Sequence, residues 1–292
     1  MSESSFHDWL RARARPIDRL LIPIGDDLAG LRNYSSNAFL LVGADQVLDG
    51  VHFDLKTHDP KLIGRKAMNR NLSDCAAMAC LPWAAVATLA LPRGAGEALA
   101  RAIVEGMEEA GAAFDCPLVG GDTGSWDGPL AISVTILGRD GNIRPVQRSG
   151  ARPGDKLYVT GPLGGSILGR HLTFEPRVKR ARGLATHFDL HAMLDLSDGL
   201  SRDLPRLCAA SGVGATIDAS CVPIHSDARH LAGDPLDHAL HDGEDYELLF
   251  ACPMCDDPHV IEIGCVEKEA GVRVRDASGV RPLVPRGWEH SL

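Results

Sequence analysis

The sequence has no long apolar run. Crossing a membrane takes about 18 consecutive apolar residues, and the longest apolar stretches here, such as residues 85–91, have the length of a strand. Arg11, Arg13 and Arg15 precede no apolar segment of the kind found in secretory signals. With 45% apolar and 24% charged residues, the 292-residue chain has the composition of a globular protein. We therefore expect a cytoplasmic protein that contacts no membrane.

A surplus of basic residues is also absent. Lys and Arg number 30 against 39 Asp and Glu, which gives a net charge of −9. The overall field of such a chain does not attract nucleic acid, so we expect no nucleic-acid partner. If the protein handles phosphates, a divalent metal ion is the usual agent that offsets the repulsion.

The common short motifs of nucleotide binding and hydrolysis are missing. The glycine-rich stretch 161–169 lacks the Lys-Ser/Thr ending of a P-loop. Its backbone amides could hold an anion, although close packing of a strand against a helix is the alternative. No GxGxxG follows a strand with an acid at the required spacing, and neither GxSxG nor HExxH occurs.

A disulfide framework is not expected, because the eight cysteines occur in a long chain without an export signal. Cys252 and Cys255 form a CxxC, and His259 and Cys265 follow, so a zinc site is one reading. Pro253 and the adjacent apolar segment favour the other reading, the end of a buried strand.

Turn-forming residues concentrate between 148 and 155, which predicts two domains, residues 1–148 and residues 149–292. Strand and helix patterns interleave in both, which predicts an α/β or α+β protein with mixed sheets. Residues 172–190 read as polar and irregular. Helices are expected over residues 5–15, 61–80, 95–112, 161–171 and 200–211.

Aspartates recur where apolar segments end and turns begin, and one more lies on the buried stripe of the expected helix 61–80. They are Asp26, Asp27, Asp45, Asp122, Asp195 and Asp198, with Asp74 in the helix. Buried carboxylates are costly unless paired, and no comparable set of Lys and Arg lies beside them in the sequence. Several converging acids repel one another unless cations lie between them, and Mg²⁺ prefers such oxygen ligands. We therefore predict a multi-metal phosphate site; for each single aspartate, turn formation or helix capping is the alternative.

Taken together, these segments resemble the thiamine-monophosphate kinase family, within the wider PurM-like group of ATP-using enzymes. The resemblance spans nearly the whole chain in family order, and the LSDGL and GEDYEL segments are its most specific parts. The matching stretches are Ile24–Asp27, Asp45–Phe53, Gly64–Asp74, Ala76–Met78, Leu118–Thr123, Arg148–Asp155, Leu194–Leu200, Gly243–Phe250 and Gly287–His290.

The resemblance implies transfer of the γ-phosphoryl group of ATP to thiamine monophosphate, with several Mg²⁺ ions and ATP as co-substrate. It implies metal ligands at Asp27, Asp45, Asp74, Asp122, Asp195 and Asp198. It implies ATP contacts at Gly121, Asp122, Arg148 and Ser197, and thiamine-phosphate contacts at His52, Glu244 and Trp288. Because the acceptor phosphate is already ionised at neutral pH, no general base and no covalent nucleophile is assigned.

Residue chemistry alone leaves other readings open for these positions. Arg148 could be a solvated linker arginine and His52 a satisfied interior histidine. Glu244 could belong to a solvated acidic loop, or it could supply the charge opposite a thiazolium cation. Trp288 could stack on a ligand ring or cover the edge of a core.

The resemblance also implies a two-domain PurM-like fold. In it, the N-terminal domain binds ATP and metal and forms a homodimer through its sheet. The chain departs from the family at Gly43 and Ala44, where a threonine is usual before Asp45, and at His241 and Asp242. Two alternatives follow: a related ATP-dependent enzyme with another acceptor, and a weakly active paralogue that binds nucleotide or thiamine phosphates.

Overall fold

The structure is a computed structural model, and it describes residues 9, 11–12, 19–23, 25–32 and 38–289. Most of the helix expected over residues 5–15 lies outside the described residues, although Trp9, Arg11 and Ala12 are helical. Ile24 and His290, which belong to two of the matching stretches, also lie outside them.

The N-terminal half forms a six-stranded sheet with the strand order β1-β2-β3-β6-β4-β5. Only the β4–β5 pair is parallel. The strands are β1 (Leu20–Ile22), β2 (Ala29–Arg32), β3 (Phe39–Leu48), β4 (Leu81–Pro92), β5 (Leu118–Trp126) and β6 (Ala131–Arg139).

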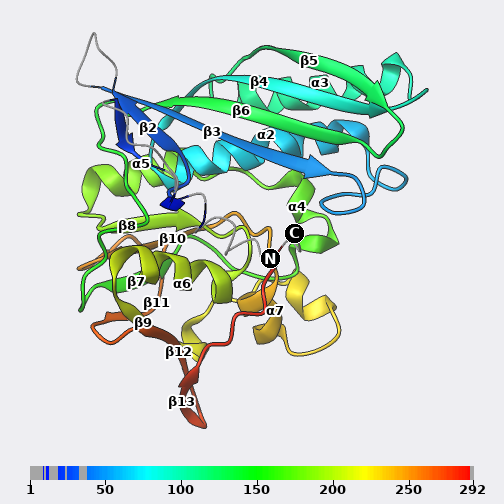
Figure 1. The fold of residues 1–292 in the computed structure, drawn as a ribbon. Helices are drawn as coiled ribbons and strands as arrows, with labels where there is room; N and C mark the ends of the chain where they lie inside the picture. Colours follow the sequence, from blue (N-terminus) through cyan, green and yellow to red (C-terminus); the bar gives the residue numbers. More distant parts are fainter. Residues whose placement is uncertain (1–8, 10, 13–18, 24, 33–37, 290–292) are drawn as a thin grey trace.

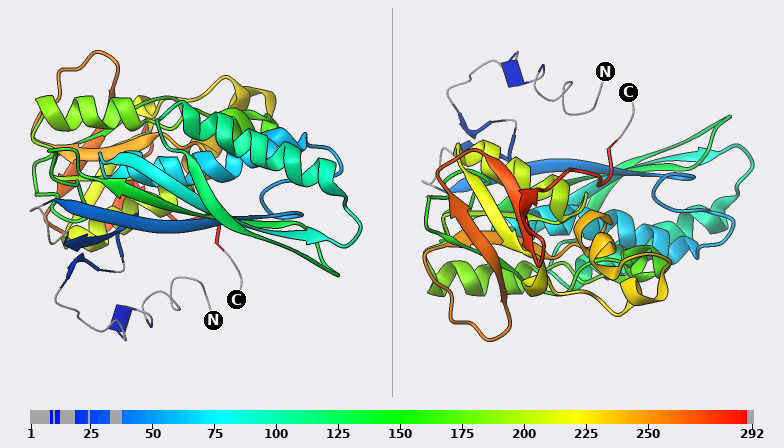
Figure 2. Two further views of the ribbon diagram at one scale, coloured as in Figure 1. Left: turned by 90° about the horizontal axis from the view of Figure 1, so that it is seen from above. Right: turned by 90° about the horizontal axis from the view of Figure 1, so that it is seen from below.

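Two helices, α2 (Pro60–Ala77) and α3 (Glu97–Ala112), cover one face of this sheet (Figures 1 and 2). Asp59 caps α2 by accepting a hydrogen bond from the Lys61 amide, and Pro60 suits the first turn. The two helices approach each other closely at Gly64 and Gly106. A Cβ atom on Gly64 would lie 1.9 Å from the Ile103 carbonyl oxygen, and one on Gly106 would lie 1.9 Å from the Lys61 carbonyl oxygen. The core of this half lies between these helices and the sheet.

No helix of the described residues covers the opposite face of the sheet, which we call the open face. Along β4, Ala87 and Leu89 are buried toward the helices, whereas Trp83, Val86 and Thr88 point the other way and are exposed. Every residue of β5 from Val119 to Trp126 is exposed, because this strand lies at the edge of the sheet.

The C-terminal half forms a seven-stranded mixed sheet with the order β13-β12-β9-β11-β7-β10-β8. The strands are β7 (Lys156–Val159), β8 (Ala192–Asp195), β9 (Gly214–Asp218), β10 (Leu248–Cys252), β11 (Ile261–Glu267), β12 (Gly271–Asp276) and β13 (Gly279–Pro282). The helices are η1 (Ser166–Leu168), α4 (Arg170–Thr173), α5 (Val178–His187), α6 (Leu200–Ser211), η2 (Ala219–Cys221), η3 (Asp227–His230) and α7 (Pro235–His241).

The two halves meet along α2, which contacts α4, α5 and β8. A shared apolar cluster joins Ala76 and Ala79 at the end of α2 to Tyr158, Leu184 and Phe250 of the C-terminal half. Between Arg139 and Lys156, a stretch described in full, the chain forms no helix or strand. The α+β class with mixed sheets is therefore confirmed, and the boundary expected at residue 148 falls in this connection.

Two local expectations were wrong. The helix expected over 161–171 is only the short η1 and α4, because Gly164, Gly165 and Gly169 adopt positive φ angles that interrupt it. The segment 172–190 is not irregular, since α5 lies within it and packs Val178, Ala181 and Leu184 inward. No helix among the described residues has the length and apolarity to cross a membrane.

Candidate functional site

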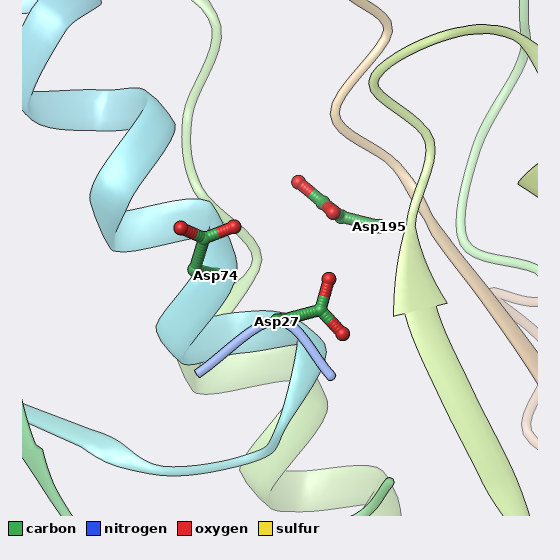
Figure 3. Close-up of side chains that lie close together, drawn as sticks. All are labelled: Asp27, Asp74 and Asp195. Atoms are coloured by element: carbon green, nitrogen blue, oxygen red, sulfur yellow. The ribbon is translucent and has the colours of Figure 1, made fainter. Parts of the chain in front are cut away.

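Three aspartates from distant parts of the chain converge between the two halves (Figure 3). Asp27 precedes β2, Asp74 lies in α2, and Asp195 ends β8. One carboxylate oxygen of each lies within 4.8 Å of the others. Of the six aspartates expected to bind metal, these three form what we call the aspartate cluster.

Burial and mutual repulsion shape the titration of the aspartate cluster. Burial raises the pKa of Asp195 to about 7, and the Asp27 carboxylate adds to this effect. The pKa of Asp74 is raised well above its usual range, first by burial and then by Asp195 and Asp45. These carboxyl groups are therefore placed where a bound cation would favour their ionised form.

Polar neighbours orient the cluster. The Ser73 hydroxyl donates to Asp195 Oδ2 at 2.5 Å, and the Arg148 guanidinium forms two bonds to Asp27, at 2.5 and 3.1 Å. Asp26 accepts a bond from the Arg148 amide, and burial raises the pKa of Asp26 to about 6. The donor set consists of oxygen atoms on three elements, which suits a hard divalent cation.

Two further aspartates lie beside the cluster, each held by an arginine. Asp45 accepts from Arg70 Nε at 2.6 Å, and its amide donates to the Asn71 side chain. Asp198 pairs with Arg206 at 2.5 Å. Both aspartates are partly exposed, so neither is closed off from solvent.

Of the residues expected at the thiamine-phosphate and nucleotide sites, all but Gly121 and Asp122 line one of two cavities. The first, with a volume of about 710 Å³, we call the Trp288 cavity; Val51, Ile167 and Leu231 give it an apolar rim. It is also lined by His52, Arg70, Ser197, Asp198, Glu244 and Trp288. Apolar walls with a few convergent polar groups are typical of small-molecule sites.

Glu244 and His52 are held by a buried lysine that the sequence analysis did not single out. Lys66 Nζ lies 2.7 Å from Glu244 and 2.5 Å from the His52 carbonyl oxygen. Burial alone would raise the pKa of Glu244, but His171, Lys66 and Arg70 outweigh it and lower that pKa to about 2. The pKa of His52 is lowered to about 4, chiefly by burial, so its ring is neutral at neutral pH.

The second cavity, of about 620 Å³, lies beside the aspartate cluster and is rich in arginine. Its basic lining consists of Arg11, Arg148, Arg202 and Arg206. We call it the arginine cavity. Guanidinium groups bind phosphate oxygens through paired hydrogen bonds, so this cavity suits a polyphosphate.

The backbone amides of the glycine-rich stretch 161–169 bind carboxylate side chains of the same chain. The Gly164 amide donates to both oxygens of Asp245, and the Gly165 amide donates to Asp242. Arg170 also bonds to Asp245. These contacts fix the loop that carries Glu244 against the C-terminal sheet.

Gly121 and Asp122 are not brought to the aspartate cluster. In the sheet register Gly121 lies across from Ala87, which lies across from Val134, which lies across from Asp45. Three strand spacings separate Gly121 from Asp45, roughly 14 Å. Asp122 pairs with Thr88 and therefore points to the open face, away from α2.

The zinc reading of the cysteine pair has no support from the arrangement. Cys252 and Cys255 form no ligand group with His259 or Cys265, because the aspartate cluster is the one such group among the described residues. Cys252 is instead the buried end of β10, and the Cys255 amide donates to the Tyr158 hydroxyl.

Sequence reasoning missed several charged residues that orient the expected ones. Asp203 in α6 is buried, accepts from the Asp198 amide and binds Arg206. Burial, and then Asp198, raises the pKa of Asp203 to about 8. The only available signal was helical spacing, which places Asp203 and Arg206 on one face.

Comparison with known proteins finds relatives that match most of the chain. Residues 25–139 match the family model for the N-terminal domain of AIR synthase related protein, and residues 152–264 match its C-terminal domain. The thiamine-monophosphate kinase of Rhodopirellula baltica is 41% identical, over 99% of this chain and 97% of that protein. That of Bacillus subtilis is 35% identical, over 78% of this chain and 76% of its own.

Solved structures extend the similarity to the fold. "AaThiL complexed with AMPPCP and TMP" has a TM-score of 0.87 and 29% identity, covering 99% of this chain and 97% of its own. The thiamine-monophosphate kinase of Stenotrophomonas maltophilia K279a has a TM-score of 0.73 and 34% identity, covering 94% and 97%. The two-domain PurM-like architecture is thereby confirmed, and the chain belongs to the thiamine-monophosphate kinase family.

Proposed function

We propose that this protein transfers the γ-phosphoryl group of ATP to the phosphate of thiamine monophosphate, giving thiamine diphosphate and ADP. The observation that carries the proposal is the aspartate cluster, whose neighbours line both cavities: Asp198 lines the Trp288 cavity, and Arg148, which binds Asp27, lines the arginine cavity. The related structure described as complexed with AMPPCP and TMP supports both substrates.

The reaction needs positioning more than covalent chemistry. An oxygen of the acceptor phosphate attacks the γ-phosphorus while the bond to the β–γ bridging oxygen breaks, and ADP leaves with that electron pair. The acceptor is already ionised at neutral pH, so no protein base is required. We assign Arg148, in the arginine cavity, and Ser197 to the nucleotide, and His52, Glu244 and Trp288 to the acceptor; Ser197 lines the Trp288 cavity beside the acceptor residues.

We assign Mg²⁺ to Asp27, Asp74 and Asp195, with Asp45 and Asp198 available at the rim. When bound, the metal would offset the negative charge of the two approaching phosphates. The raised pKa values of Asp74 and Asp195 support this assignment, because uncompensated carboxylates are costly where these two lie.

We further propose a homodimer formed through the open face of the six-stranded sheet. Asp122 points to this face, roughly 14 Å of sheet away from Asp45. Exposed Trp83, Val86 and Val119 give the same sheet an apolar surface to bury. In such a dimer Asp122 would lie at the interface, and we propose that it serves the site of the partner subunit.

The direct test is to follow thiamine diphosphate by chromatography in a mixture of protein, ATP, Mg²⁺ and thiamine monophosphate. Product from the parent, and none from Asp195→Asn or without acceptor, is expected. No product with nucleotide binding intact would refute the kinase proposal. It would leave the binding paralogue, with Gly43 and Ala44 as its sequence support, or an enzyme with another acceptor.

Complementation tests the dimer. Asp122→Asn and Asp74→Asn are each expected to be inactive, whereas after subunit exchange their mixture should regain about a quarter of the parental activity. Each mixed dimer then contains one site with both aspartates intact. Sedimentation shows whether the mixture is dimeric, and a dimeric mixture without activity would contradict the shared site.

A further inference from the structure

Lys66 is fully buried between the two halves of the molecule. Its exposed fraction is 0%, although lysine is almost never fully buried without a partner. It lies in α2, in the N-terminal half, and its ammonium group reaches three other segments of the chain. A charge in this position is costly, so its partners must compensate it.

The ammonium group is closely surrounded by polar atoms. Its Nζ lies 2.5 Å from the His52 carbonyl oxygen, 2.7 Å from both carboxylate oxygens of Glu244 and 2.8 Å from His171 Nδ1. His171 Nδ1 also lies 3.2 Å from Glu244 Oε2, so the imidazole contacts both charged groups. Two of these partners belong to the C-terminal half, so Lys66 joins the halves directly behind the wall of the Trp288 cavity.

Glu244 needs this support because its backbone conformation is unusual. Its φ angle is +63°, in the left-handed region that side-chain-bearing residues seldom adopt. Its amide donates to the Ser197 carbonyl oxygen, and its own carbonyl oxygen accepts from Ser166. Backbone contacts thus set the turn, and Lys66 sets the direction of the carboxylate.

Arg70, one helical turn beyond Lys66, completes the charge balance. Its Nη1 lies 3.7 Å from Glu244 Oε1, and its Nε binds Asp45. Lys66 and Arg70 together match the charges of Glu244 and Asp45. Glu244 is therefore already neutralised within the protein, and its position matters more than its free charge.

We propose that Lys66 is a positioning residue for the acceptor, holding the Glu244 carboxylate in the geometry that the Trp288 cavity requires. The inference rests on the proposed kinase function and deepens it. Lys66 lies two turns from Asp74 along α2, about 12 Å, so its effect should be confined to the acceptor and spare the phosphoryl-transfer centre.

A double-mutant cycle tests this role. Lys66→Met keeps most of the length of the side chain and removes its charge; it should raise the KM for thiamine monophosphate by about tenfold, leaving kcat and the KM for ATP within about twofold. Glu244→Gln should raise the same KM. Because Lys66 acts through Glu244, the double variant should show the KM of the worse single variant and not the product of the two effects.

The control is Lys61→Met on the same helix, since Lys61 forms an exposed pair with Glu109. Its kinetic constants should match the parent's. If Lys66→Met alone does not fold, Glu244→Gln and the double variant decide: equal KM values support the proposal, and a further rise overturns it. An unchanged KM in folded Lys66→Met, or multiplicative effects, also overturns it. Absence of thiamine diphosphate with the unmodified chain would instead refute the kinase function itself.

Discussion

Helix α2 meets the C-terminal half at two charged centres, and they are built in opposite ways. At the Asp74 end, buried carboxylates face one another and the pKa values of Asp74 and Asp195 are raised. At the Lys66 end, the carboxylate of Glu244 is matched by cations within the protein and its pKa is lowered to about 2.

The two centres therefore differ in how their carboxylate charge is balanced. Raised carboxyl pKa values mean that the folded protein disfavours its own charges, and binding a divalent cation removes that penalty. A lowered carboxyl pKa means that the protein supplies the counter-charge itself. We therefore assign the metal to the first centre and the orientation of the acceptor to the second.

The largest loss of activity is expected from a substitution in the aspartate cluster. Asp74→Asn should lower thiamine diphosphate formation by more than about a hundredfold. Substituting a residue that only orients a metal ligand already lowers metal affinity or activity roughly 10- to 100-fold, and Asp74 is assigned as a ligand itself. Without divalent metal the same variant should melt no lower than the parent, since the change removes repulsion within the cluster. Activity assays and thermal melting in a chelator check both outcomes. A loss of activity that merely follows a loss of folding would contradict the assignment.

A smaller effect is expected at Ser73, which orients Asp195 without belonging to the cluster. Ser73→Ala removes the 2.5 Å bond to Asp195 Oδ2 and leaves the carboxylate in place. The dependence of rate on Mg²⁺ concentration should shift to about tenfold higher concentrations, with the rate at saturation largely retained. The shift is measured from the rate at increasing Mg²⁺ concentrations, with ATP held in constant excess. Identical titration curves for variant and parent would show that the hydroxyl does not orient the ligand.

The pH dependence of stability should have opposite signs at the two centres. The pKa of Asp195 is about 7 when folded and 3.8 when unaffected by structure, so the folded state binds more protons between these values. The contribution of Asp195 to the free energy of unfolding therefore falls as pH rises from about 4 to about 7, by at most about 1.4 kcal/mol per pH unit. The pKa of Glu244 is lowered from 4.5 to about 2, so its contribution to the free energy of unfolding is fully present above pH 4.5. That contribution is lost as pH falls toward 2.

Urea unfolding in a chelator between pH 5 and 8 measures the first of these contributions. The parent should be more stable at pH 5 than at pH 7, and Asp195→Asn should flatten the slope. A slope that is equally steep in the variant would assign the effect to other groups. The Asp203 carboxyl, with its pKa raised to about 8, is the next to substitute.

The sequence allowed prediction of the aspartate cluster more readily than of its surroundings. Asp27 and Asp195 follow apolar segments beside glycine or serine, and Asp74 interrupts a buried helical stripe, so each stood out by local pattern. Their convergence from three elements depended on how the two halves pack, which no local pattern contains. The family resemblance supplied that step.

Lys66 was missed for a physical reason. A lysine within a helix is usually solvated, and its burial here follows from partners 105 and 178 residues away, His171 and Glu244. The helix α5 was missed because Val178, Ala181 and Leu184 form a narrow apolar stripe among basic residues. In both cases contacts between the halves decide the structure, and propensity does not.

The smallest expected effect comes from Asp218, which local pattern alone cannot distinguish from Asp195. Both end an apolar strand of the same sheet, β9 and β8. Asp218, however, is one-third exposed and pairs with the half-exposed Arg275 at 2.8 Å. Asp218→Asn should therefore cost no more than about 1 kcal/mol of stability, less at high salt, and leave the rate unchanged. Denaturant unfolding at two salt concentrations, with the activity assay, makes the comparison. A large loss of activity would mean that strand-end acidity matters by itself, whereas a silent variant beside an inactive Asp195→Asn shows that convergence in a buried site is what gives an aspartate its function.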